Sequence, residues 1–517
     1  MLATSPTNGD FWWFDAPSHA MNGVFVHDLI QAAPTHHPAQ WAINYYLKYP
    51  AVTILFYPPV FPVVEAIFYF VFGVSHFTAQ LAVCFFDALL ALAVYRIVST
   101  AFSKPVAFGA AMLTLGLPGI ALWGRQVMLE IPAWCFAAWS VFFVLQYMES
   151  GRARSLIAGA VLAVIALYTK QTFLFMIPAL ALALLWRCGW RVLLRREVWI
   201  AAIVAAVLVA PLAIITLKLG KMNADLASGQ ALGGTDRFSL AGWTYYAQML
   251  LHDCGVIPLV LAAIAVAIAI WKRPPVSSLF AMMVSLFVAG YVFFSLIALK
   301  DERYTLHLIV PVAIAAAAAF PLLLPARAAG WVAAIAGVLI FGLTISTQKV
   351  PWVAGPLEAA KLAAQYAPPD SSILLNTHRS AAFIFDLRAL GTRPDLRVIR
   401  AEKLLADYRQ GRDYGVKALD VNRAEIAQYF PKYRIGVIVF QTGFWTDIPT
   451  IGALDDIIRG TGFDVIRLVN VTGNVRHEET DLRVLRYTGP LAEHAAPIDL
   501  NIPLIGQHFS EKPARKP

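Results

Sequence analysis

The sequence predicts a polytopic α-helical membrane protein that ends in a soluble α/β domain. Hydrophobic residues make up 59% of the 517 residues and charged residues only 14%, unlike a soluble globular chain. A helix that crosses a bilayer needs about 20 mostly apolar residues, and roughly ten such runs lie in the first ~350 residues. Charge returns in the last ~165 residues, which therefore belong to an aqueous environment.

The apolar runs give the expected spans in order, which together predict a transmembrane helical domain over residues 77–346. An earlier run at 51–73 contains three prolines and Glu65. Prolines kink helices and a carboxylate inside the membrane is costly, so this run either spans or lies along one face. The ten expected spans are 77–98, 105–122, 130–147, 155–170, 171–186, 198–218, 255–271, 278–299, 305–324 and 328–346.

The distribution of positive charge predicts the orientation. One alternating set of loops is short and consistently basic, and one of its members carries four arginines between residues 187 and 196. Lys and Arg accumulate in cytoplasmic loops, so this set is expected in the cytoplasm. The other set is mixed in sign and contains Glu130, Lys170 and Arg303, so it is expected to face outside.

Residues 1–76 are expected to form an outer-face first loop with juxtamembrane helices, provided that the run 51–73 lies on that face. No signal peptide is visible, because residues 1–10 are polar and lack a basic or apolar start. An outer N-terminal segment normally needs a span before it for export. We therefore expect that the true first transmembrane helix lies upstream of Met1.

Asp15 follows a run of aromatic residues, "FWWF", and precedes His19 by four positions. One interpretation is an aromatic belt at the membrane interface with an incidental acid and a structural histidine. The other is a general base, since partial burial raises a carboxyl pKa and a nearby cation holds it down. If the segment is helical, Asp15 and His19 share one face.

Charged residues at the outer ends of several spans form a second set of candidates. Glu130 either complements the start of a helix or acts as a second acid that positions a metal or the acceptor. Lys170 marks the tip of a tight helical hairpin, where it either snorkels to headgroups or binds a phosphate. Arg303 and Tyr304 start a later span, and Arg suits bidentate phosphate contact unless it pairs with Asp301 beside it.

Several classes of function are not expected. The net charge of +9 is explained by basic cytoplasmic loops, so nucleic acid is not an expected partner. The four cysteines have neither metal nor disulfide spacing. No Walker loop, GxSxG or HExxH motif occurs where it would function, which argues against an ATP-driven pump.

The ordered set of these pieces resembles the GT-C glycosyltransferases, and within them the bacterial relatives of protein O-mannosyltransferase and lipid A aminoarabinose transferase (glycosyltransferase family 39). The resemblance covers residues 11–346. The matching pieces are "FDAPSHAMNG", "YPPVFPVVEAIFYFVFGVS", "VYRIV", "MLEIPAW", "YTKQTFLFMIPAL" and "ERYTLHLIVP". It departs from the family pattern at Ala16, where a Glu is usual, and at Tyr57, where Lys or His is common.

The resemblance implies roles for individual residues. Asp15 would be the catalytic base and Glu130 the second acid of the active site. Lys170 and Arg303 would contact the carrier phosphate. The remaining substrate-binding positions would be His19, Tyr57 and Tyr304. No cofactor is certain; a divalent cation, Mg²⁺ or Mn²⁺, stays open, with the missing Glu at position 16 arguing against it.

The function that the resemblance implies is transfer of a sugar from a polyprenyl-phosphate carrier to an acceptor hydroxyl, with inversion. The reaction would take place on the extracytoplasmic face of the bacterial inner membrane, among membrane lipids. The acceptor would be a lipid, a glycan or a protein. Two alternatives stay open: a flippase for lipid-linked sugars that performs no chemistry, and a non-catalytic scaffold for envelope assembly.

The C-terminal part, residues 350–487, is expected to be an extracytoplasmic α/β domain that covers the active site or docks the acceptor. Short apolar strands alternate there with amphipathic helices, as in a small α/β sheet. The tail 488–517 is rich in proline and polar residues and is expected to be loosely ordered. The expected strands are 372–376, 396–400, 435–441, 463–469 and 482–487, with helices at 379–389, 401–409, 422–430 and 452–459.

Overall fold

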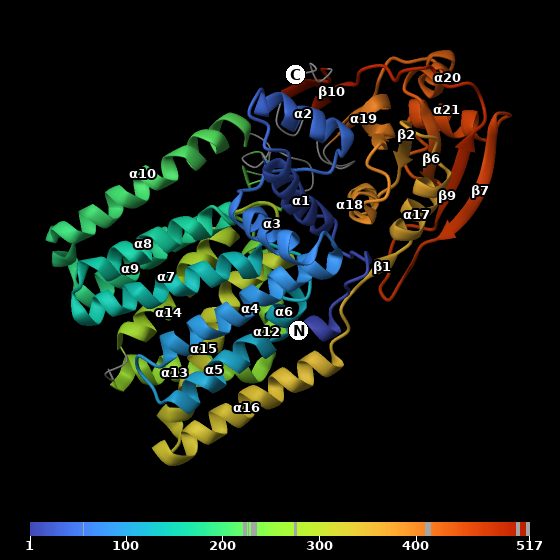
Figure 1. The fold of residues 1–517 in the computed structure, drawn as a ribbon. Helices are drawn as coiled ribbons and strands as arrows, with labels where there is room; N and C mark the ends of the chain where they lie inside the picture. The colour runs from blue at the N-terminus through green and yellow to red at the C-terminus, as the bar shows by residue number, and fades with distance from the viewer. Residues whose placement is uncertain are drawn as a thin grey trace. The chain divides into compact units, whose positions relative to one another are not determined.

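The computed structural model confirms a largely helical chain with a C-terminal α/β domain (Figure 1). It describes the whole chain except residues 55, 221–224, 226, 229–234, 273–276, 409–414, 503–506 and 513–517. The chain forms two compact units, which we call the membrane unit and the α/β unit. The membrane unit comprises Met1–Ser5, Tyr57–Phe61 and Gln80–Val350, and the α/β unit comprises Pro6–Phe56, Pro62–Ala79 and Pro351–Pro517.

The membrane unit is built almost entirely from apolar helices. Its elements are η1 (Leu2–Thr4), α4 (His76–Val98, in this unit from Gln80), α5 (Lys104–Gly116), α6 (Pro118–Trp123), α7 (Glu130–Ser150), α8 (Ala153–Leu167), η2 (Gln171–Phe175), α9 (Met176–Cys188), η3 (Trp190–Leu194), α10 (Arg196–Leu219), α12 (Leu240–Cys254), α13 (Val256–Lys272), α14 (Ser277–Ser295), η4 (Glu302–Thr305), α15 (Leu306–Leu323) and α16 (Ala326–Thr347). Of the described helices, seven are long and apolar enough to cross a membrane. The pair α12 and α13, bent by 111°, would make an eighth.

Three of the expected spans differ in the structure. The run 255–271 forms α13, which reaches the length of a span only together with α12 across their bend. The run 105–122 is divided into α5 and α6, because Pro118 starts a new helix after Leu117 takes an extended backbone. The run 155–170 forms α8, which has 15 residues and is therefore shorter than a typical span.

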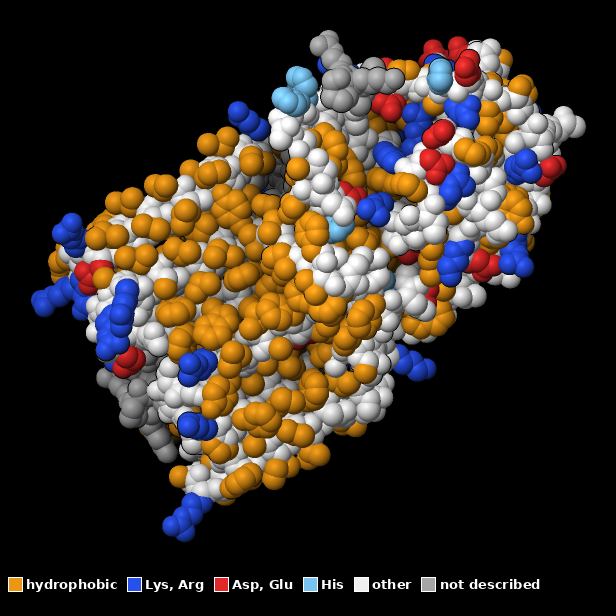
Figure 2. Space-filling view, in the orientation of Figure 1, with side chains coloured by type: hydrophobic (Ala, Val, Ile, Leu, Met, Phe, Trp, Pro, Cys, Tyr) orange, Lys and Arg blue, Asp and Glu red, His pale blue; other side chains and the backbone are white. Residues whose placement is uncertain are grey.

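Lipid-facing surfaces explain the exposed apolar side chains. Only 11% of the most apolar stretch of α10 is buried, and 22% of that of α16. Figure 2 shows hydrophobic side chains covering much of the helical surface, with blue side chains concentrated at helix ends. Such extensive apolar exposure is stable only against hydrocarbon, which supports a multi-pass membrane protein.

Helices α5 and α16 pack side by side through glycines (Figure 1). A Cβ built at Gly109 would lie 2.3 Å from the Ala333 carbonyl oxygen, and one at Gly337 would lie 2.4 Å from the Gly109 carbonyl oxygen. Small residues let helix backbones approach closely where lipid supplies no hydrophobic drive.

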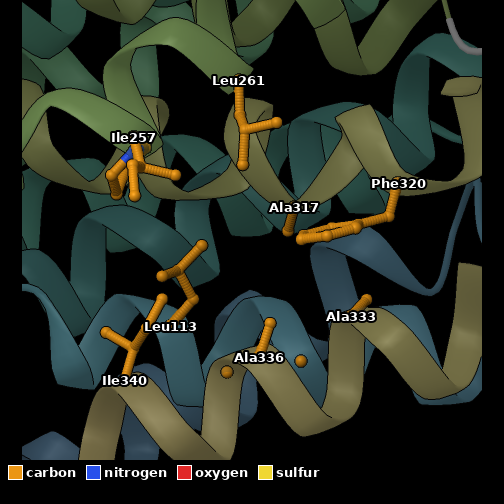
Figure 3. Close-up of a pocket in the computed structure, with 11 residues that line it drawn as sticks. Leu113, Ile257, Leu261, Ala317, Phe320, Ala333, Ala336 and Ile340 are labelled. Carbon is orange, nitrogen blue, oxygen red and sulfur yellow. The ribbon is translucent and has the colours of Figure 1, made fainter. Parts of the chain in front are cut away.

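Beside this contact lies a small apolar void of about 20 Å³, lined by α5, α13, α15 and α16. Leu113, Leu261, Phe320 and Ile340 surround it (Figure 3). Its walls offer almost no polar surface that would hold a water.

We expect Gly109→Ala to lower the free energy of unfolding by about 1–3 kcal/mol, because the added methyl meets backbone that cannot rotate away. The measurement is thermal unfolding of the detergent-solubilised chain. The matched control is Gly342→Ala in α16, where a Cβ would meet nothing within 4 Å. This control should be neutral or slightly stabilising; equal losses in both variants would contradict the close-packing argument.

The α/β unit joins three N-terminal helices to the C-terminal domain. Its helices are α1 (Ala16–Ala32), α2 (Pro38–Lys48), α3 (Val60–Phe72, in this unit from Pro62), α17 (Pro356–Tyr366), α18 (Ser380–Leu390), α19 (Ala401–Leu405), α20 (Arg423–Lys432) and α21 (Pro449–Ile458). Its strands are β1 (Val353–Ala354), β2 (Ser372–Asn376), β3 (Arg397–Arg400), β4 (Ala406–Tyr408), β5 (Val416–Ala418), β6 (Ile435–Gln441), β7 (Phe463–Asn470), β8 (Thr472–Gly473), β9 (Asp481–Tyr487), β10 (Asp499–Ile502) and β11 (Gln507–Ser510).

The main sheet has the strand order β3-β2-β6-β9-β7. Strand β2 is parallel to β3 and β6, whereas β9 is antiparallel to both of its neighbours. Every residue of β2 and β6 is buried, as expected for central strands that are covered on both faces. Within the tail 488–517, the described residues include an antiparallel pair of β10 with β11.

Candidate active site

Glu130 and Lys170 form a buried ion pair in the membrane unit. Glu130 is the first residue of α7, where the helix dipole favours an acid, and it is fully buried. Lys170 lies between α8 and η2, and its ammonium contacts Glu130 Oε1. The Lys170 side chain is only 9% exposed. Each buried charge is tolerated because the other compensates it.

Arg303 and Tyr304 join this pair from η4. Arg303 Nε lies 3.9 Å from Glu130 Oε1, and the Lys170 ammonium lies 5.6 Å from the centroid of the Tyr304 ring. Asp301 also pairs with Arg303, with 2.6 Å between Nη2 and Oδ2. The structure therefore brings together four of the predicted site residues from three distant parts of the chain. We call them the Glu130 cluster: Glu130, Lys170, Arg303 and Tyr304.

Tyr57 lies in a short segment of the same unit, Tyr57–Phe61, and is half-buried. In this segment the Val60 N–H donates a hydrogen bond of 3.1 Å to the Tyr168 carbonyl oxygen. The bond ties the segment to the chain two residues before Lys170. The structure thus places Val60, three residues after Tyr57, against the chain that leads into Lys170.

His307 is a further polar residue next to the Glu130 cluster. Its ring is fully buried, with its centroid 4.2 Å from that of Phe294 and 4.8 Å from that of Phe173. Nδ1 lies 3.2 Å from the Tyr304 carbonyl oxygen, and among the described residues Nε2 has no hydrogen-bond partner. The sequence places His307 in the same segment as Arg303 but assigns it no role.

Asp15 and His19 lie together in the α/β unit. Asp15 is the N-cap residue of α1, and its side chain makes no capping hydrogen bond. Its carbonyl oxygen accepts the His19 N–H at 2.9 Å, so both residues belong to the first turn of one helix. Asp15 is half-buried, whereas His19 is buried. The predicted site residues thus form two groups, one in each unit.

The chain resembles known glycosyltransferases in sequence and in structure. Residues 57–215 match the family model of dolichyl-phosphate-mannose-protein mannosyltransferase. No curated protein sequence matches. The crystal structure of apo ArnT from Cupriavidus metallidurans superposes with a TM-score of 0.60 at 13% identity, covering 92% of this chain and 94% of ArnT. The chain has the GT-C fold.

A second structure of the same GT-C protein is that of ArnT bound to undecaprenyl phosphate. It also gives a TM-score of 0.60 at 13% identity, and it covers 91% of this chain and 93% of that one. The family model covers Tyr57, Glu130 and Lys170 but ends before Arg303.

The described residues include no group of three His, Cys, Asp or Glu side chains that could hold a metal ion. The carboxylates of Glu130 and Asp301 each contact a cationic side chain, Lys170 and Arg303 respectively. Lys170 and Arg303 are thus the cationic side chains of this site that could contact an anion.

Proposed function

We propose that the chain is a membrane glycosyltransferase that moves a sugar from a polyprenyl-phosphate carrier to an acceptor hydroxyl on the extracytoplasmic face. The observation that carries this proposal is the Glu130 cluster, in which Lys170 and Arg303 lie beside the fully buried Glu130 carboxylate inside a GT-C fold, with Asp301 as the nearer partner of Arg303. The family model that matches residues 57–215 supports a lipid-phosphate sugar as donor.

The leaving group sets the demands on the site. Cleavage of the bond between the anomeric carbon and the phosphate oxygen releases a polyprenyl phosphate, whose growing negative charge needs cations more than a protonating acid. Lys170 and Arg303 supply these cations. Glu130 holds the Lys170 ammonium in place before the donor arrives, so that little reorganisation is needed when the phosphate binds.

Asp15 is the proposed general base. Its carboxylate takes the proton of the acceptor hydroxyl as the hydroxyl oxygen attacks the anomeric carbon from the face opposite the phosphate. The new glycosidic bond forms as the phosphate leaves, so the anomeric configuration is inverted. His19 and Tyr57 are the proposed contacts to the sugar, and Tyr304 orients Lys170 through its ring.

The test is a transfer assay with the purified chain in liposomes that contain a synthetic polyprenyl-phosphate sugar labelled in the sugar. We expect label to leave the carrier and polyprenyl phosphate to accumulate when membrane extract is supplied as the source of acceptor. The labelled product should have the inverted linkage. Carrier that crosses the bilayer intact, without release of polyprenyl phosphate, would contradict the enzyme and indicate a flippase.

A further inference from the structure

The backbone just before Asp15 is held by one arginine of the C-terminal domain. Arg379 precedes α18, and its Nη1 donates hydrogen bonds to the carbonyl oxygens of Phe11, at 3.1 Å, and Trp12, at 2.7 Å. Its guanidinium carbon lies 4.7 Å from the centroid of the Phe14 ring. Three of the four residues that lead into Asp15 therefore contact the same side chain.

Arg379 is itself fixed by a buried acid. Its Nε pairs with Glu479 Oε1 at 2.8 Å, and the Glu479 side chain is only 1% exposed. His378 Nδ1 lies 3.4 Å from the same carboxylate oxygen. Burial by itself raises the pKa of Glu479, but the His378 hydrogen bond and the Arg379 charge outweigh it and lower the pKa to about 2. The carboxylate thus stays ionised at neutral pH and keeps Arg379 in one orientation.

The C-terminal end of α18 contacts the chain after Asp15, in helix α1. Arg388, in the last turn of α18, forms two hydrogen bonds to Asp28 of α1, from Nε at 2.9 Å and from Nη2 at 2.6 Å. Tyr45 also donates to Asp28, at 2.7 Å. Helices α1 and α18 pack against each other between these two points (Figure 1). Arg379, at the start of α18, therefore contacts the chain before Asp15, and Arg388, near its end, contacts the chain after it.

We propose that Arg379 is a positioning residue that sets the backbone of Asp15 for proton transfer, and that this is a task of the C-terminal domain. The proposal rests on the proposed function, because it assigns importance to the place of Asp15. Two hydrogen bonds from one planar guanidinium fix both the position and the direction of the chain at residues 11–12. A displacement of about 1 Å at a catalytic group costs on the order of 10²-fold in rate, so a fixed backbone matters there.

The experiment compares Arg379→Ala with Arg397→Ala in the full chain, in the same liposome assay. Arg397 is also a largely buried arginine of this domain, and it donates to Ser372 Oγ at 2.7 Å and to the Tyr433 carbonyl oxygen at 3.3 Å. Its other hydrogen bonds, to Glu511 and to the Ala496 carbonyl oxygen, also lie within the C-terminal part of the chain and away from residues 11–15. We expect Arg379→Ala to lower kcat on the order of 10²-fold with the donor KM unchanged. Arg397→Ala should lower the Tm without this loss of kcat.

Arg379→Lys tests the same proposal if the alanine variant fails to fold. Lysine keeps a positive charge beside Glu479 but lacks the planar guanidinium that donates to the two backbone carbonyl oxygens. The kcat should therefore fall while the Tm stays close to that of the wild type. A kcat equal to wild type in Arg379→Lys, or parallel losses in Arg379→Ala and Arg397→Ala, would overturn the positioning role. Asp15→Asn is measured alongside, because wild-type transfer in that variant would refute the base itself and not the role of Arg379.

Discussion

Asp15→Asn should reduce sugar transfer by about 10²- to 10⁴-fold, which is the usual contribution of a general base. The amide has nearly the same shape as the carboxylate but cannot accept the acceptor's proton. The fold should survive, because the substitution hardly changes the size of the side chain. The measurement is the single-turnover rate of sugar release from a defined polyprenyl-phosphate donor.

Asp10→Asn is the matched control, since Asp10 is a second acid of the same N-terminal segment, five positions earlier. Burial raises the pKa of Asp10, so its neutral amide should be tolerated without loss of rate. A rate for Asp15→Asn within the range of the control would remove Asp15 from the mechanism.

Lys170→Met should have the second largest effect, on both stability and activity. Removing one partner of a buried pair leaves the other charge uncompensated, which costs about 3–5 kcal/mol of unfolding free energy. Glu130 would be that charge, because Arg303 remains 3.9 Å from its Oε1 and is engaged by Asp301. Transfer should be abolished, since the main cation for the carrier phosphate is gone. Denaturant titration in detergent and the transfer assay measure the two effects.

The double variant Glu130→Leu with Lys170→Met separates the two roles of the pair. Replacing both charges by apolar side chains is often neutral or stabilising, so the lost stability should return. Transfer should not return, because no ammonium meets the phosphate. If the double variant recovers both stability and transfer, the pair is purely structural and the proposed donor site is wrong.

Much of the membrane unit's site can be predicted from the sequence. Glu130, Lys170 and Arg303 stand at span ends that the alternation of basic loops assigns to one side, and the structure places them within contact distance. The pairing of Arg303 with Asp301 is a local contact that the sequence also offers as an alternative. The break between α5 and α6 follows from Pro118 but is hidden by the continuous hydrophobicity around it.

In the α/β unit, the sequence predicts the positions of strands but not how distant segments pair. Apolar runs bounded by turn residues predict strands such as β2 (Ser372–Asn376) and β6 (Ile435–Gln441) at the expected positions. The strand order cannot be predicted this way, because it depends on pairings between distant segments. Neither can the contact of Arg379 with Phe11, since no local periodicity links two positions so far apart.

That contact joins residues separated by 368 positions, and it has a consequence for biogenesis. Ribosomes deliver the N-terminal segment first, and domains fold as they emerge. The hydrogen bonds from Arg379 to the segment before Asp15 therefore form only after most of the polypeptide has been synthesised. If Asp15 is the base that we propose, sugar transfer should therefore begin only after translation has reached the C-terminal domain.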